Sequence, residues 1–72
     1  MTKRMAQEIS DSVILKLREI RIQKGISQYR LAKDVGMSKS SILYIETLKQ
    51  RPTLYTVVLL STYLGVDLKD IL

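Results

Sequence analysis

The chain has no cysteine and no histidine among its 72 residues. Without cysteine there are no disulfides and no thiolate metal sites. Without histidine the commonest general base and the commonest neutral metal ligand are missing. Ser40 and Ser41 therefore have no histidine to activate either of them as a nucleophile. We expect no enzyme, no metal site and no cofactor.

Long apolar runs are also missing. The longest, residues 57–60, is far too short to cross a bilayer. Residues 1–15 begin with two positive charges but contain no extended apolar segment, so they do not have the pattern of a secretory signal. We expect a cytoplasmic protein without membrane contact.

The chain length and the charge balance set further bounds. Residues 1–72 suffice for one domain, with residues 1–10 as an N-terminal extension that could be the start of the first helix. A domain of this size buries only about 60% of its unfolded surface, so it needs regular packing or a partner subunit. Twelve basic and seven acidic residues give a net charge of +5, which suits a polyanionic partner.

Glycine and proline are scarce and punctuate the chain at Gly25, Gly36, Pro52 and Gly65. Between them apolar residues recur at three- and four-residue steps, which predicts an all-α fold. We expect a compact domain of five helices. The first starts near residue 3 or only near residue 11, where Ser10 or Asp11 could cap it, and ends at residue 24. The others cover residues 28–35, 39–47 and 54–64 and a short segment after Asp67.

Capping residues and apolar rows support these helices. Ser27, Ser38 and Thr53 precede three of them as N-caps. The predicted inner row of the first helix is Met5, Ile9, Val13, Leu17 and Ile20, and that of the fourth is Leu54, Val57, Leu60 and Leu64.

The most informative segment is residues 27–46, in which a tight turn joins two short helices. Ala32 lies where the helices must approach closely, and Gly36 lies where the chain must reverse with a positive φ. Ile42 and Ile45 would hold the second helix against the core. These features are typical of a helix-turn-helix.

The chain resembles the phage repressor and Cro type of helix-turn-helix protein, which is lambda-repressor-like and belongs to the XRE family. The resemblance rests on Leu17, Ile20-Arg21, Gly25-Ile26-Ser27-Gln28, Leu31-Ala32, Gly36-Met37-Ser38, Ile42, Ile45-Glu46, Pro52 and Leu64-Gly65-Val66. It implies five helices, with a recognition helix at about residues 38–47 in the major groove of double-stranded DNA.

The resemblance also implies roles for individual residues. Lys39, Ser40 and Tyr44 would reach base edges, for which lysine and serine have suitable hydrogen-bonding groups. Ser41 and Leu43 would also face outward on this helix and contact the DNA groove or backbone. Gln28, Lys49 and Arg51 would contact the DNA backbone. Arg21 and Glu46 would form a structural pair between the first and third helices.

Arg30 stands where the family usually has an acidic residue that completes a capping box with the serine. A cation in the first turn of a helix is unfavourable unless an anion arrives, so we expect Arg30 to contact a phosphate. A second departure is Thr47-Leu48, because the family often has glycine or asparagine just after the glutamate. The path of the following loop is therefore left open.

The fourth predicted helix is apolar on all sides, because Tyr55, Val58, Leu59 and Tyr63 complete its circumference. Such a helix is buried on more than one side. We therefore expect a homodimer formed through this helix and the final one. The alternative is ordinary packing of these side chains within the chain.

These observations predict a sequence-specific transcription regulator, a repressor that binds a near-palindromic operator as a dimer. A phage or mobile-element repressor, a restriction-modification controller and an antitoxin all remain open. The alternative function is an antitoxin or interaction module that holds a small protein partner on the fourth helix. Between Gly25 and Thr53 five basic and two acidic residues leave 5 − 2 = +3, which favours DNA.

Overall fold

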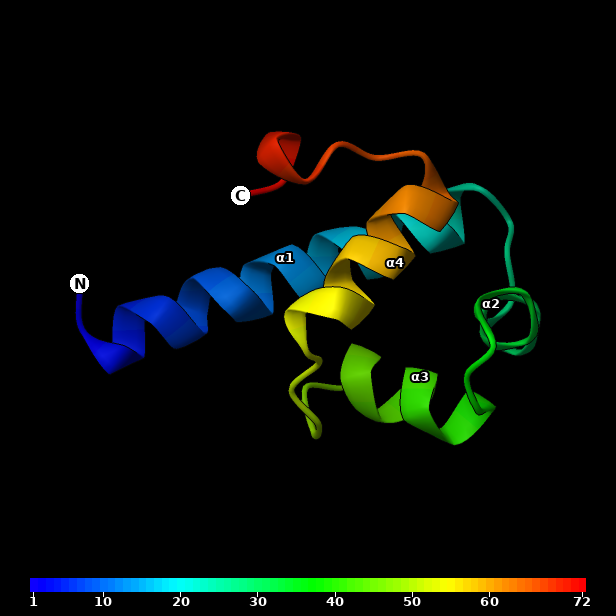
Figure 1. Ribbon diagram of the computed structural model, residues 1–72, viewed down its shortest axis with the longest axis horizontal. Coiled ribbons are helices and arrows are strands. Elements are labelled where there is room, and N and C mark those ends of the chain that lie inside the picture. Colours follow the sequence, from blue (N-terminus) through cyan, green and yellow to red (C-terminus); the bar gives the residue numbers. More distant parts are fainter.

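Four α-helices and one 3-10 turn form the protein in a computed structural model that describes residues 1–72 (Figure 1). The helices are α1 (Lys3–Gln23), α2 (Gln28–Val35), α3 (Lys39–Glu46) and α4 (Leu54–Leu64), and the turn is η1 (Leu68–Asp70). The predicted all-α class is confirmed. The predicted short last segment is present and Asp67 caps it, but it completes only a single 3-10 turn, so the protein has four α-helices rather than five helices of this kind.

Hydroxyl caps begin three of the helices at the predicted positions. The side chains of Ser27, Ser38 and Thr53 each accept a hydrogen bond from the backbone N–H three residues later, at 3.0, 3.1 and 3.2 Å. These bonds satisfy donors that the first turn of a helix leaves unpaired. At the other end of α2, Gly36 has φ 74°, the left-handed conformation that reverses the chain into α3.

The helix α1 begins at the earlier of its two predicted starts. Thr2 is the cap, and its hydroxyl accepts from the backbone N–H of Met5 at 3.1 Å. Ser10 and Asp11 lie inside the helix. At about 1.5 Å per residue, α1 alone is roughly 31 Å long and sets the 35 Å long dimension of the molecule. Its N-terminal turns extend past the other helices (Figure 1).

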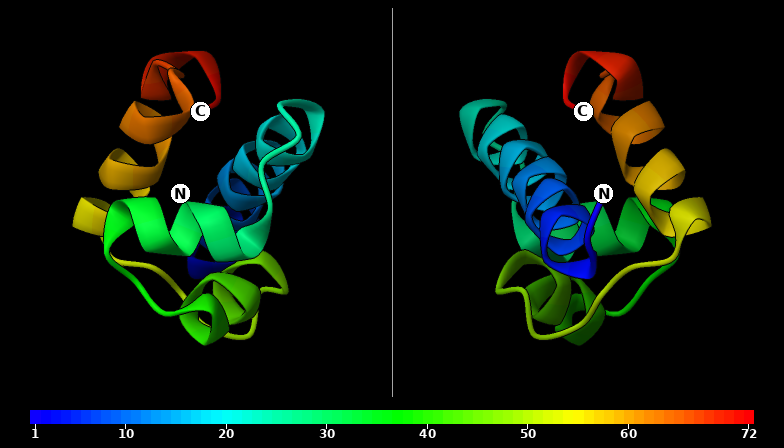
Figure 2. Two further views of the ribbon diagram at one scale, coloured as in Figure 1. Left: turned by 90° about the vertical axis from the view of Figure 1, so that its right-hand side faces the viewer. Right: turned by 90° about the vertical axis from the view of Figure 1, so that its left-hand side faces the viewer.

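All four helices and the chain end contribute to one core of ten buried apolar side chains. These are Val13, Ile14 and Leu17 of α1, Leu31 and Ala32 of α2, Ile42 and Ile45 of α3, Leu60 and Leu64 of α4, and Ile71. The helix α4 packs along the C-terminal half of α1, and α2 and α3 close the opposite side of the core (Figures 1 and 2).

The predicted inner rows of α1 and α4 were wrong at their N-terminal ends. Met5 and Ile9 are 50% and 40% exposed because no other helix reaches the first turns of α1. Leu54 is also exposed, since the first turn of α4 projects beyond the core. Ser61 takes an inward position on α4 instead, and its hydroxyl donates to the carbonyl oxygen of Val57, which satisfies this buried polar atom.

Leu48 resolves the path of the chain after α3. It has φ 62°, a left-handed conformation that a residue with a Cβ rarely adopts. Its N–H donates to the carbonyl of Ile45 at 3.0 Å, and the N–H of Lys49 donates to that of Tyr44 at 2.9 Å. This pair of bonds is a Schellman motif, which normally has glycine at the left-handed position. Leucine therefore occupies the conformation for which glycine or asparagine is usual.

Two substitutions at this position test the backbone strain. Leu48→Gly and Leu48→Ala both shorten the side chain, but only alanine retains the Cβ that opposes a positive φ. We expect the glycine variant to be more stable than the alanine variant by about 1 kcal/mol. Urea unfolding followed by circular dichroism measures the difference. Alanine as the more stable variant would show that residue 48 is not left-handed.

Candidate nucleic-acid interface

The helices α2 and α3 and the turn between them form one hydrogen-bonded unit. Within the turn, the N–H of Met37 donates to the carbonyl of Ala32 at 2.8 Å. The inner face of α3 is anchored by Ile42 and Ile45, which are almost completely buried. Both views of Figure 2 place α3 at the outer edge of the molecule, with α2 between it and the upper part of α4. One face of α3 is therefore fixed, and the opposite face is free to meet a partner.

The structure brings most of the residues predicted for α3 onto this free face. Lys39 and Ser40 are exposed in the first turn of the helix. Leu43 and Tyr44 follow one turn later and are 41% and 46% exposed. Ser41 differs from them, because it is half-buried and its hydroxyl accepts a hydrogen bond from the Ser38 hydroxyl at 2.9 Å.

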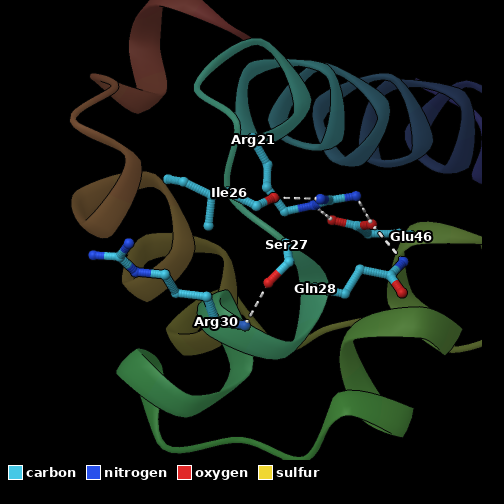
Figure 3. A network of polar contacts seen from close by, with 6 residues as sticks. All are labelled: Arg21, Ile26, Ser27, Gln28, Arg30 and Glu46. Atoms are coloured by element: carbon cyan, nitrogen blue, oxygen red, sulfur yellow. Dashed lines mark hydrogen bonds and ion pairs between the residues drawn. The ribbon is translucent and has the colours of Figure 1, made fainter.

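Arg21 and Glu46 form a buried ion pair between α1 and the last residue of α3 (Figure 3). The Arg21 Nε donates to Glu46 Oε2 at 2.7 Å, and Nη2 donates to Oε1 at 2.9 Å. The third nitrogen, Nη1, donates to the carbonyl oxygen of Ile26 at 2.6 Å. Both side chains are less than 10% exposed. A bidentate geometry of this kind restricts orientation as well as separation.

Gln28 belongs to the same network. Its Nε2 donates to Glu46 Oε1 at 3.0 Å, so the first residue of α2 is tied to the end of α3 (Figure 3). The family resemblance implied a DNA backbone contact for Gln28 and gave no indication of this internal bond. The sequence contains no local signal for it, because 18 residues separate the two side chains.

Arg30 lies on the other side of α2 and points away from this pair (Figure 3). Its Nε is 3.6 Å from Asp34 Oδ2, one helical turn later, and the guanidinium remains largely exposed. The negative charge that we expected beside Arg30 is therefore supplied in part by Asp34 of the same helix.

Tyr63 of α4 contacts the same carboxylate, because its hydroxyl donates to Asp34 Oδ2, the oxygen that also faces Arg30. This hydrogen bond lowers the pKa of Asp34 below its ordinary 3.8, and the nearby charge of Arg30 acts in the same direction. The same bond raises the pKa of Tyr63 above 10.0. Tyr63 was predicted to lie in a dimer interface, and the structure shows its hydroxyl bonded within the protomer.

The loop between α3 and α4 carries the two other predicted contacts to DNA. Lys49 and Arg51 are both exposed, and neither has a carboxylate within 4 Å. The N–H groups of Lys49 and Gln50 both donate to the carbonyl of Tyr44, at 2.9 and 3.1 Å. The loop is thereby attached to the end of α3. Figure 1 shows it on the same side of the molecule as that helix.

A family model described as helix-turn-helix matches residues 17–71 of the chain. The chain belongs to the Cro/C1-type helix-turn-helix family, the XRE family. No curated protein and no solved structure matches it. Members of this family are DNA-binding transcription regulators, so α2 and α3 are its helix-turn-helix and α3 is the helix that the family uses for recognition. None of the helices has both the length and the apolar character needed to cross a membrane.

Removing one partner of the buried pair tests how far α3 depends on it. Glu46→Ala leaves the Arg21 guanidinium buried without a carboxylate, and we expect the free energy of unfolding to fall by about 3–5 kcal/mol. The control is Glu8→Ala, which removes an exposed pair with Arg4 at 3.3 Å and should cost less than about 1 kcal/mol. Thermal and urea unfolding compare the two variants. Equal losses would mean that Glu46 contributes no more than a surface charge.

Proposed function

We propose that the chain is a cytoplasmic repressor that binds a near-palindromic operator as a homodimer, with α3 in the major groove. The observation that carries this proposal is the combination of an anchored α3 with a free outer face. The N-terminal turn of that face presents Lys39, an exposed cation with no carboxylate within 4 Å. Because α3 is held in place before DNA binds, less conformational entropy is lost when the interface forms.

Base recognition falls to three side chains on this face. Lys39 donates to the O6 and N7 acceptors of guanine, and Ser40 donates to or accepts from a neighbouring base. Tyr44 offers a hydroxyl and an apolar ring to the next base or to a sugar. Leu43, exposed beside it, supplies an apolar contact to a thymine methyl or a deoxyribose.

Contacts to the phosphates surround these three side chains. Lys49 and Arg51 reach the DNA backbone from the loop, and Gln28 does so from the start of α2. Gln28 is held in place by its bond to Glu46. Arg30 and Ser41 have weaker roles, since Arg30 brings its own counterion, Asp34, and the Ser41 hydroxyl already accepts from Ser38. Contacts of this kind fix register and affinity but not sequence preference.

Selection of bound sequences from random DNA, followed by salt titration, tests the function. We expect a near-palindrome to be enriched. Lys39→Ala should cost about 1–3 kcal/mol at one base position in each half-site and relax the preference there. Arg51→Ala should weaken all sequences alike and reduce the slope of log K against log salt by about 0.9 for each phosphate that the variant no longer neutralises.

Lys24→Ala is the matched control for the loss of one positive charge. Lys24 is exposed, has no carboxylate within 4 Å and follows the C-terminal end of α1, which Figure 2 places far from α3, so the variant should affect neither the preference nor the slope. If no sequence is enriched and no binding is detected at low salt, the DNA-binding proposal fails.

The proposed dimer is supported by an apolar surface on α4. Tyr55 is 73% exposed and Val58 46% exposed, and Leu59 lies half-buried beside them. The dimer would cover these side chains and the ring of Tyr63, whose hydroxyl is already bonded to Asp34. Two-fold symmetry of the protein would match the symmetry of a near-palindromic operator.

Sedimentation equilibrium tests the dimer. We expect the protein to dimerise at micromolar concentration and Val58→Glu to abolish association, because a charge would be buried without a partner. Ile22→Glu, on the exposed surface of α1, is the control and should leave the dimer intact. A monomeric wild-type protein at high micromolar concentration would contradict the dimer. The α4 surface would then be the place to test the alternative, a small protein partner bound by an antitoxin or interaction module.

A further inference from the structure

The helix α1 has a face whose character changes along its length. Lys3, Gln7, Ser10, Ile14, Leu17 and Arg21 follow one another at alternating steps of four and three residues, so they form a single row along the helix. Ile14, Leu17 and Arg21 are buried in the body of the protein. The three residues before them are polar, in the part of α1 that extends beyond the other helices (Figure 1).

A groove separates these polar residues from the loop that follows α3. Its inner part is lined by Gln7, Ser10 and Asp11 of α1 and by residues 48–52 of the loop. Its outer part is lined by Lys3, Ala6, Gln7, Ser10 and Arg51. Gln7, Ser10 and Arg51 line both parts, so the groove is continuous from the loop to the first turn of α1.

The groove carries a net positive charge that no ion pair within the chain neutralises. Lys3, Lys49 and Arg51 line it, whereas Asp11 is its only acidic residue. None of these four side chains forms an ion pair within 4 Å. The neighbouring Arg4 differs, because it is bonded to Glu8 at 3.3 Å. Lys3 is also in the first turn of α1, where the helix dipole disfavours a cation and favours a bound anion.

We propose that this groove binds the DNA backbone and that Lys3, with Gln7 and Ser10 as hydrogen-bonding neighbours, contacts a phosphate beyond those reached by α3 and its loop. The proposal rests on the proposed DNA-binding function and extends its surface along α1. Charge complementarity favours a polyanion, and Arg51 makes the groove continuous with the loop assigned to the backbone. The contact is independent of sequence, because no base edge is involved.

Salt titration of operator binding by Lys3→Gln and Arg4→Gln tests the proposal. Both variants remove one positive charge from the same turn of α1. One fewer phosphate neutralised per protomer should reduce the slope of log K against log salt by about 0.9, or about 1.8 for a dimer. We expect this reduction for Lys3→Gln, with an unchanged sequence preference, and wild-type behaviour for Arg4→Gln. Ethylation interference should show one phosphate per half-site whose effect disappears in Lys3→Gln.

The outcomes separate this inference from the function on which it rests. If the wild-type protein selects an operator and Lys3→Gln matches Arg4→Gln in slope and interference pattern, the groove does not bind DNA and the recognition surface still stands. If the wild-type protein selects no sequence, the DNA-binding function itself fails. Circular dichroism of both variants checks that α1 keeps its helicity, so that a smaller slope in Lys3→Gln reports the missing lysine–phosphate interaction rather than a melted helix.

Discussion

The position of α3 depends on the buried ion pair between Arg21 and Glu46. Glu46 is the last residue of α3, where a negative charge faces the negative end of the helix dipole and would be unfavourable alone. Arg21 neutralises that charge from α1 and at the same time holds the Ile26 carbonyl at the entry to α2. The Arg21 guanidinium therefore links α1, the segment that leads into α2, and the end of α3. Ser38 secures the other end of α3, so both ends of the helix are fixed independently of DNA.

The cations on α3 and its loop have no counterion within the chain. Arg4, Arg21, Arg30 and Lys69 each have a carboxylate within 4 Å. Lys39, Lys49 and Arg51, on α3 and its loop, have none. Cations without internal partners can neutralise phosphates and release the counterions held by DNA, which supplies essentially all of the affinity of non-specific protein–DNA binding and a large share of that of specific binding.

The features that were predictable from sequence depend on residues close together in the chain. Ser27, Ser38 and Thr53 cap helices through bonds that span three residues, and Gly36 acts on its own backbone, so their roles could be identified without a fold. The start of α1 was harder to predict because Thr2, Ser10 and Asp11 are all acceptable caps. Only the structure shows that Thr2 is used.

What could not be predicted depends on contacts between distant segments or on the extent of the core. The bonds from Gln28 to Glu46 and from Tyr63 to Asp34 span 18 and 29 residues, and neither has a periodic signature. Met5, Ile9 and Leu54 have inward-facing spacing, but they are exposed because no helix covers them. Spacing alone reports which face a residue is on, not whether anything covers that face. The roles of the site residues toward DNA likewise stay predictions.

The uneven support of α1 has a consequence for its dynamics. Forming the first turn of a helix is unfavourable, whereas adding residues to an existing helix is not. The buried half of α1 therefore acts as a permanent nucleus from which the unsupported turns propagate. Those outer turns can open and close locally, and their amide hydrogens exchange through such fraying, while amides near Leu17 exchange only when the core opens. The outer turns of α1 therefore depend on the core, whereas the core does not depend on them. Fraying of the outer turns leaves the core intact, but unfolding of the core also unfolds the outer turns.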